Sequence, residues 1–454
     1  MRLRFELEIL RDVWAMTWPT ITYSVLESLV LLTDVYMVGR LGTAVAKDAV
    51  SAVGISSQIM MLVMVSAFAV TVGTATLVAQ FIGAGKRVEA GETARQALLA
   101  IFAVSWLLAV PMVVLSAPIL RAMGADAGVL RFGVPYMQIS FAGVVMVSLN
   151  FATSAIFRGS GDMITPLKIA AVINVLNLGL NYALIFGCGP FPALGVSGAA
   201  LGTVISRGIG GVVAVYLLSR PGGRIQVRWA NGLRPNWDVL RRMLRIGLPA
   251  AGTGLLRNGA RTLFLRVLTA TAASSSAAVS AYVVASRLSM TVILPALAFQ
   301  AAATTLVGQA IGRGDRDQAE RLAWEAIKLC ALVMLVVSAA LFFAAWPLTR
   351  FFHSDHAVYG ASVQVIRFVA VGQVFASIAI VTSGALAGAG DTRPAFAYTA
   401  ITDWGLTLPV AWALAIGLGL GASGAWWPLA IAPGVQAVLL VGRFARGAWR
   451  HITV

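Results

Sequence analysis

Twelve long apolar segments, separated by short polar turns, follow one another along the chain. They cover about residues 14–38, 50–73, 94–118, 134–157, 164–187, 195–219, 243–268, 277–301, 323–346, 363–388, 395–418 and 423–444. A helix needs about 20 apolar residues to cross a bilayer. Apolar side chains lie all round each segment instead of alternating, which favours spanning helices over strands. The pattern predicts an all-α polytopic membrane protein with twelve transmembrane helices.

The composition excludes a soluble globular protein. Of the 454 residues, 59% are hydrophobic and 11% are charged, and the mean hydropathy is +0.85. In soluble domains, roughly 45–50% of the residues are apolar and about 25% are charged. The sequence has no Gly-rich phosphate-binding loop that ends in Gly-Lys-Ser/Thr, so we expect neither ATP-driven transport nor an enzyme. The two Cys and three His residues show no metal-ligand spacing, and we predict no cofactor.

The net charge of +16 is distributed unevenly among the loops. Most of the 34 Lys and Arg residues lie at the N-terminus and in the connections after even-numbered segments, above all in the stretch 220–245. Such a bias marks the cytoplasmic side of a membrane protein. It predicts that both termini lie in the cytoplasm. The basic residues form no single patch, so we expect the lipid bilayer as partner and no nucleic acid.

An internal repeat divides the chain into two halves. The stretch Leu-Val-Ala-Gln-Phe-Ile-Gly-Ala-Gly at 77–85 matches 306–314, and the turn at 159–162 matches 388–391, both at an offset of 229 residues. We therefore predict an N-lobe over residues 1–222, a cytoplasmic linker over 223–242 and a C-lobe over 243–454. Because each lobe has an even number of helices, the repeat is parallel. Transporters commonly bind their substrates at such repeats, near the middle of the membrane.

Polar side chains inside the apolar segments are the candidate functional groups. Glu27 and Asp34 lie seven residues apart on one face of the first segment, and the fifth segment carries Asn174, Asn177 and Asn181. An ionisable group inside a span costs ~2.5–3.5 kcal/mol on insertion scales, so such residues usually serve function. This group could hold a proton or a sodium ion. The alternative is that the side chains only hydrogen-bond the helices to one another.

The second half carries basic residues instead. Arg257, Arg261 and Arg287 lie in the seventh and eighth segments, and Asp403 lies in the eleventh. Glu27 is eight residues after Pro19, and Arg257 is eight residues after Pro249. We therefore predict that Glu27 and Arg257 face each other or a shared cavity, as part of a gate or a structural ion pair. All five charged residues are candidates for the substrate path.

Several motifs resemble those of multidrug and toxic compound extrusion (MATE) transporters, and together they span essentially the whole chain. Thr33-Asp34-Val35-Tyr36-Met37-Val38-Gly39-Arg40-Leu41-Gly42 is similar to the signature that closes the first helix in that family. The repeated Leu-Val-x-Gln-x-Ile-Gly-x-Gly, the loop at 388–394, the fifth segment at 177–187 and the start of the sixth at 195–200 resemble further family motifs. The resemblance implies two six-helix bundles with alternating access, located in the bacterial inner membrane, and drug efflux driven by H⁺ or Na⁺.

The resemblance also implies roles for individual residues. Asp34 matches the first-helix carboxylate proposed to couple to the cation, and Asn177 and Asn181 match the polar pair of the fifth helix. Thr203 and Tyr136 match polar neighbours of that pocket. Arg257 stands where many NorM-like members carry Glu, and the region around Ala376 offers no carboxylate, so a sodium site in the C-lobe is not supported.

Taken together, we expect a monomeric, cation-coupled antiporter that exports drug-like organic compounds. Coupling falls to Asp34, and protons are favoured over sodium because a hard cation needs several oxygen ligands. Sodium at Asp34 remains the alternative coupling ion. The alternative function is a flippase for lipid-linked oligosaccharides or lipids of the same superfamily, since buried arginines suit a pyrophosphate. A membrane scaffold without transport activity would leave Asp34 unexplained.

Overall fold

The computed structural model describes residues 2–40, 43–188, 191–229, 232–271, 275–352 and 356–452, and the regular elements in these ranges are all helices. Ten of the described helices are long and apolar enough to cross a membrane. A pair bent by 46°, α5 (Ala127–Ala142) and α6 (Val144–Gly159), makes eleven when it is counted as one span. The remaining predicted span, the seventh in the chain (243–268), lies on α9 (Trp237–Thr269), in which Arg257, Asn258 and Arg261 lower the hydropathy.

The described chain packs into two units. Thr22–Gly247 forms one unit, and the residues before and after it form the other. We call the first the N-lobe and the second the C-lobe from here on. The sequence repeat assigned the start of the chain to the N-lobe, but its contacts lie with the C-terminal half, because Ile9 and Val13 are buried in an apolar core with residues such as Phe299.

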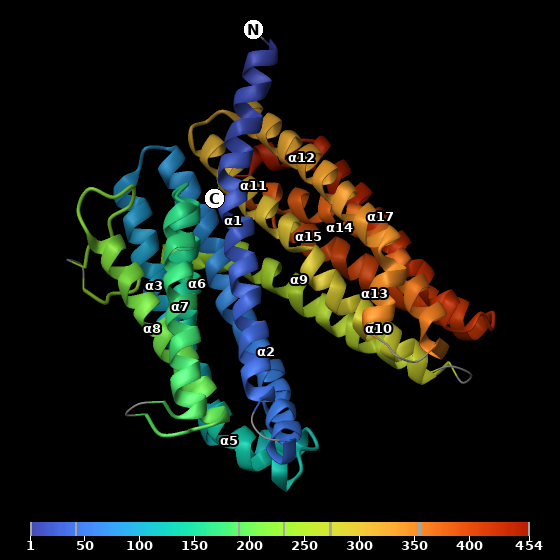
Figure 1. The fold of residues 1–454 in the computed structure, drawn as a ribbon. Coiled ribbons are helices and arrows are strands. Elements are labelled where there is room, and N and C mark those ends of the chain that lie inside the picture. Colours follow the sequence, from blue (N-terminus) through green and yellow to red (C-terminus); the bar gives the residue numbers. More distant parts are fainter. Residues whose placement is uncertain are drawn as a thin grey trace. The chain divides into compact units, whose positions relative to one another are not determined.

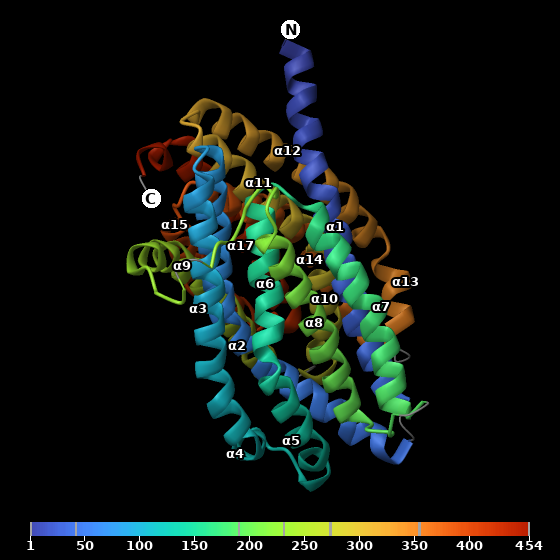
Figure 2. The ribbon, with the colours of Figure 1, turned by 90° about the vertical axis from the view of Figure 1, so that its left-hand side faces the viewer.

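The N-lobe is a bundle of long helices. In Figure 1, α3, α6, α7 and α8, coloured blue to green, lie alongside one another. Figure 2 shows α4 and α5 at one end of this bundle. Besides α5 and α6, the lobe contains the second part of α1 (Arg2–Gly39), α2 (Thr43–Gly83), α3 (Arg87–Val114), α4 (Ser116–Ala122), α7 (Ile164–Phe186), α8 (Val196–Ser219) and the start of α9.

The C-lobe is a second bundle, coloured yellow to red in Figure 1. Small residues such as Ala303, Ala323 and Ala385 fill its core, which lets the helices approach closely. Its elements after α9 are α10 (Ser275–Val292), α11 (Leu294–Gly312), α12 (Arg316–Phe343), α13 (Ala345–Phe352), α14 (His356–Gly388), α15 (Arg393–Thr399), the π-helix η1 (Ala400–Thr407), α16 (Leu408–Trp412), the π-helix η2 (Ala413–Gly417), α17 (Gly421–Ala445) and the 3₁₀-helix η3 (Ala448–His451).

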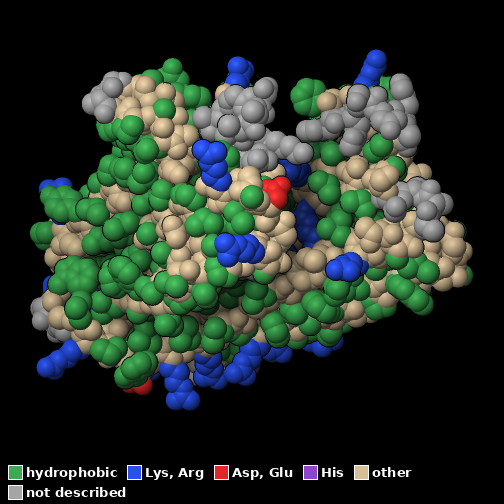
Figure 3. Space-filling view, turned by 90° about the horizontal axis from the view of Figure 1, so that it is seen from below, with side chains coloured by type: hydrophobic (Ala, Val, Ile, Leu, Met, Phe, Trp, Pro, Cys, Tyr) green, Lys and Arg blue, Asp and Glu red, His purple; other side chains and the backbone are tan. Residues whose placement is uncertain are grey.

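Large apolar side chains lie on the outside of the molecule. Hydrophobic side chains cover much of the face shown in Figure 3. Leu107, Val175 and Val438 are each more than 70% exposed. Exposed apolar surface of this extent is typical of contact with lipid. The chain is thus a multi-pass membrane protein, as its hydropathy predicted.

Two glycines set the distance between α7 and α8. A Cβ atom at Gly198 would overlap the backbone of Leu184, and one at Gly202 would overlap the side-chain oxygen of Asn181. The two glycines are four residues apart, which is the small-xxx-small spacing that brings membrane helices together. This packing fixes α7, and with it Asn177 and Asn181, against α8.

The loop that leads from α8 to α9 is fastened to α3. Arg95 on α3 is only 2% exposed and forms an ion pair with Glu92 at 2.7 Å. Its guanidinium also donates to the backbone oxygens of Gly232 and Arg234, and Gln96 donates to the latter oxygen at 3.0 Å. The predicted linker is therefore held by the N-lobe instead of hanging free.

The chain passes from one lobe to the other inside two helices. It enters the N-lobe after Ile21, within α1, and leaves it after Gly247, within α9. A proline lies next to each crossing, Pro19 in α1 and Pro249 in α9. Proline removes one backbone hydrogen bond from a helix and is a common cause of kinks.

Candidate functional site

The Asp34 carboxylate, on α1, is hydrogen-bonded to side chains of α7 and α8. Asn181 Nδ2 donates to its Oδ1 at 2.5 Å, and the Thr203 hydroxyl lies 3.5 Å from its Oδ2. Asn181 is fully buried, whereas Asp34 is partly exposed. The sequence predicted these three residues to lie together, and the structure brings them together.

A second layer of amide and hydroxyl groups supports this contact. The Asn177 amide donates to Thr203 Oγ1 at 3.2 Å and to Ser206 Oγ at 3.4 Å, and its oxygen accepts from Asn181 at 3.2 Å. Asn177 is 2% exposed. Ser206 was not among the predicted residues, although its position one turn after Thr203 on α8 could have indicated it. The cluster thus links three helices through one carboxylate.

Two further predicted residues differ in their relation to this cluster. Tyr136, on α5, packs beside Met37 and Val38 and is close enough to Asp34 to interact electrostatically. Asn174 lies one turn before Asn177, but both of its polar side-chain atoms are buried and have no hydrogen-bond partner among the described residues. Asn174 therefore stands outside the Asp34 network. Leu41 and Gly42 of the first-helix motif lie outside the described residues.

Glu27 has a partner that the sequence did not identify. Its carboxylate pairs with the Arg207 guanidinium of α8 at 2.8 Å, and the two side chains are 22% and 14% exposed. The Asn150 amide of α6 donates to the backbone oxygen of Arg207. The i,i+4 spacing of Thr203 and Arg207 could have placed Arg207 on the same face as the Asp34 site.

That Glu27 and Arg257 face each other or a shared cavity stays a prediction, and each residue has a partner within its own lobe. Glu27 is occupied by Arg207 within the N-lobe, and Arg257 donates to Gln436 Oε1 at 3.2 Å within the C-lobe.

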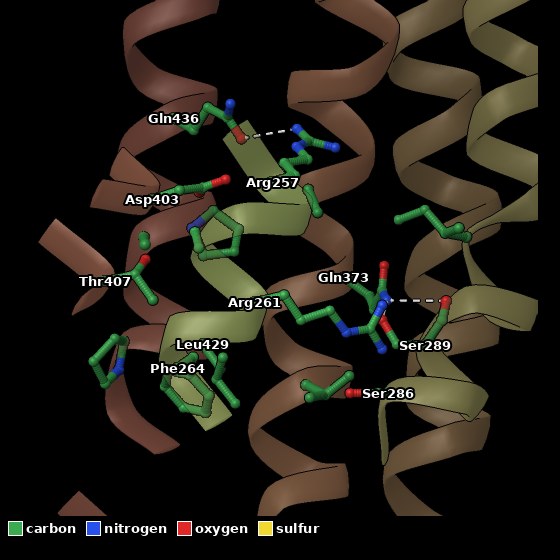
Figure 4. A pocket seen from close by; sticks show the side chains of 18 of the residues that line it. Arg257, Arg261, Phe264, Ser286, Ser289, Gln373, Asp403, Thr407, Leu429 and Gln436 are labelled. Atoms are coloured by element: carbon green, nitrogen blue, oxygen red, sulfur yellow. Dashed lines mark hydrogen bonds between the residues drawn. The ribbon is translucent and has the colours of Figure 1, made fainter. Parts of the chain in front are cut away.

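The C-lobe contains a pocket of about 370 Å³. Figure 4 shows Arg257, Arg261, Gln373 and Asp403 around it, contributed by α9, α14 and η1. Arg257 interacts electrostatically with Asp403. The predicted residues Arg257, Arg261 and Asp403 thus share one cavity. Arg287, by contrast, is exposed on α10 and does not line it.

Neither lobe gathers ligands for a tightly held metal ion. The described residues contain no group of three or more His, Cys, Asp or Glu side chains that could hold a metal ion. In the N-lobe one carboxylate, two amides and two hydroxyls meet, and in the C-lobe two guanidiniums accompany one carboxylate. The first arrangement can exchange a proton or hold a monovalent cation, and the second favours an anion.

Comparisons with known proteins agree with this architecture. The family model for MatE matches the chain twice, over residues 19–183 and 249–413, which confirms the internal repeat. A probable multidrug resistance protein NorM from Thermotoga maritima is 28% identical over 98% of this chain and 94% of its own length. The multidrug resistance protein NorM of Burkholderia vietnamiensis is 30% identical over 76% of this chain and 75% of its own. A solved MOP superfamily transporter from Pyrococcus furiosus shares the fold with a TM-score of 0.89, at 23% identity, over 98% of this chain and 97% of that chain.

Proposed function

Because the chain belongs to the MatE family, and is therefore a membrane transporter and not an enzyme, we propose that it exports drug-like organic compounds in exchange for protons. In this proposal Asp34 carries the proton. The membrane supplies the energy through its proton gradient, and the two lobes alternately open the substrate path to each side.

The observation that carries this proposal is the set of partners around Asp34. Its hydrogen bonds are to an amide and a hydroxyl. No described basic side chain has a nitrogen within 4.0 Å of its carboxylate oxygens, the distance that defines an ion pair. Amide and hydroxyl groups can serve a carboxylate or a carboxylic acid, since both can donate and accept. A salt-bridged carboxylate, in contrast, resists protonation. Asp34 is therefore suited to take up and release a proton.

Protonation would change the contact between α1 and α7. The ionised Asp34 accepts from Asn181 Nδ2, whereas a protonated Asp34 would need an acceptor. The Asn181 Oδ1 atom is buried, accepts from no group in the described part of the chain, and would become that acceptor if the amide rotated. A proton would thereby favour one packing of these helices over another, and a ligand shifts two states only by such a difference in affinity.

The same groups support protons over sodium as coupling ion. A hard cation prefers several oxygen ligands, and Asp34 supplies the single carboxylate of the cluster. The amide nitrogen of Asn181, not its oxygen, faces that carboxylate. A sodium ion would require both amides to turn their oxygens toward one point.

Transport by everted membrane vesicles tests the proposal. A pH gradient or a Na⁺ gradient is imposed across the vesicle membrane, and ethidium uptake is measured. Vesicles that contain the wild-type protein are compared with vesicles that contain Asp34→Asn. We expect uptake on the pH gradient alone and a loss of at least about tenfold in Asp34→Asn. Asp126→Asn is the matched control, because this exposed residue caps α5 and Asn caps helices as well as Asp does.

The other outcomes overturn the proposal in separate ways. Uptake that needs Na⁺ would make sodium the coupling ion. Uptake on the pH gradient that survives Asp34→Asn would move coupling to another carboxylate. No uptake under either gradient would favour a flippase for lipid-linked substrates.

A further inference from the structure

The C-lobe pocket holds more positive than negative charge. Two arginines and one aspartate line it, and Asp403 interacts electrostatically with Arg257. Arg257 also has the Gln436 amide oxygen as acceptor. No described carboxylate lies within 4.0 Å of the Arg261 guanidinium, the distance that defines an ion pair. The neighbour of this guanidinium is the Tyr282 hydroxyl. One positive charge in the pocket is therefore not balanced.

Polar groups without partners accompany this charge. In Figure 4 the Arg261 side chain extends to the part of the pocket where Gln373 and Ser289 lie. Gln373 is 4% exposed, and its Oε1 atom accepts no hydrogen bond from the residues that the structure describes, while its amide nitrogen donates to Ser289. The Ser289 hydroxyl accepts that bond and keeps its own hydrogen to donate. Arg261 and Ser289 thus offer donors to one ligand, and Gln373 offers an acceptor.

The rest of this end of the pocket is apolar and aromatic. The rings of Phe264 and Tyr282 lie 4.9 Å apart, and Tyr282 stacks on the buried Trp426 at 6.4 Å. Phe264, Tyr282 and Met290 line the pocket. Its volume of about 370 Å³ fits one small organic molecule, and ligand pockets commonly combine apolar walls with a few polar groups.

We infer that this pocket binds small organic anions, namely aromatic carboxylates, through Arg261. The carboxylate accepts from the Arg261 guanidinium and the Ser289 hydroxyl, and the ring lies against Phe264 and Tyr282. Binding supplies the missing counter-charge for an arginine inside a membrane protein, where an unbalanced charge is costly. That such anions are also exported rests on the proposed function, whereas their binding does not.

Calorimetry on the full chain in lipid nanodiscs tests the inference. The probes are 1-naphthoate and 1-naphthylmethylammonium, which share a ring system and differ in charge. We expect the protein to bind naphthoate, and to bind the cation at least about tenfold more weakly. Arg261→Gln should weaken naphthoate binding about 10- to 100-fold, the loss expected for a hydrogen bond to a charged group. Arg261→Lys keeps the charge and should retain part of the affinity.

Arg266→Gln is the matched control, because Arg266 lies on the same helix, is exposed and does not line the pocket. It should bind naphthoate like the wild type. The unfolding temperature of each variant without ligand shows that it is folded, and Arg261→Gln should not be less stable, since it removes an unbalanced charge.

Three results would overturn the inference: no naphthoate binding, equal binding by wild type and Arg261→Gln, or stronger binding of the cation. Because calorimetry uses no ion gradient, its outcome is independent of proton-driven uptake. A protein that binds naphthoate but moves no ethidium would lose the proposed function and keep this site.

Discussion

Glu27 and Arg207 form an ion pair between two helices of the N-lobe. They pair at 2.8 Å and are both largely shielded from water. Removing one partner of a shielded pair leaves the other charge without compensation, which is costlier than removing both. The pair therefore ties α1 to α8 next to the Asp34 cluster.

We predict that Glu27→Gln destabilises the protein by about 1–3 kcal/mol, less than for a fully buried pair because some water reaches both groups. Thermal unfolding in detergent, followed by tryptophan fluorescence, measures the change. The double variant Glu27→Gln/Arg207→Gln should recover part of the loss. A double variant less stable than either single variant would contradict the assigned pairing.

For single residues, the sequence predicted which side chains belong to the site better than it predicted which groups they contact. Asp34, Asn177 and Asn181 stood out because polar side chains at helical spacing in an apolar segment are rare. Arg207 was missed as a partner of Glu27 because spacing tells which residues share a face of one helix, and not which face of another helix it meets. Asn174 was predicted with its neighbours, yet one turn of helix was enough to leave it outside the hydrogen bonds.

At the scale of helices, the contact between α7 and α8 decides the geometry of the Asp34 cluster. The contact depends on the missing side chains of Gly198 and Gly202. Because the Asn181 oxygen occupies the space beside Gly202, the packing of two helices and the position of a functional amide are set by the same residue.

We predict that Gly202→Ala lowers both stability and transport. The added methyl group would overlap Asn181 and push α7 away, and overpacking of this kind costs about 1–3 kcal/mol. Gly179→Ala, on α7, is the control, because its methyl group would meet no atom within 4 Å and Ala favours helix by up to about 1 kcal/mol. Unfolding temperature and ethidium uptake are measured together, and a Gly202→Ala variant with wild-type values in both would refute this account.

Hydropathy predicted where the helices lie, but not how they are broken. Each predicted span falls on one described helix or on two or more consecutive helical segments. The bend of 46° at Gly143 and the π-helix Ala400–Thr407 left no mark in the apolar pattern, because packing against neighbouring helices sets the local hydrogen-bond register. In α9 the charges that serve the C-lobe pocket also weakened the membrane signal.

For the whole molecule, the distribution of basic residues predicts both termini on the cytoplasmic side. Cys188 then lies on the outer side, since it follows the fifth span. It is exposed, whereas Cys330 is buried. We predict that a membrane-impermeant maleimide labels the protein in intact spheroplasts, and that Cys188→Ser abolishes the labelling. Labelling that appears only after the membrane is permeabilised would reverse the orientation.

The two helices that join the lobes limit how the lobes can move. A single connection would leave one lobe free to turn in any direction about the other. Two bodies joined at two flexible points keep only one rotational degree of freedom, about the line through those points. The chain crosses beside Pro19 in α1 and beside Pro249 in α9. As long as both helices stay intact, the lobes are tied by two covalent connections, and to the extent that each bends at its proline, the remaining freedom is a rotation about the line through the two prolines.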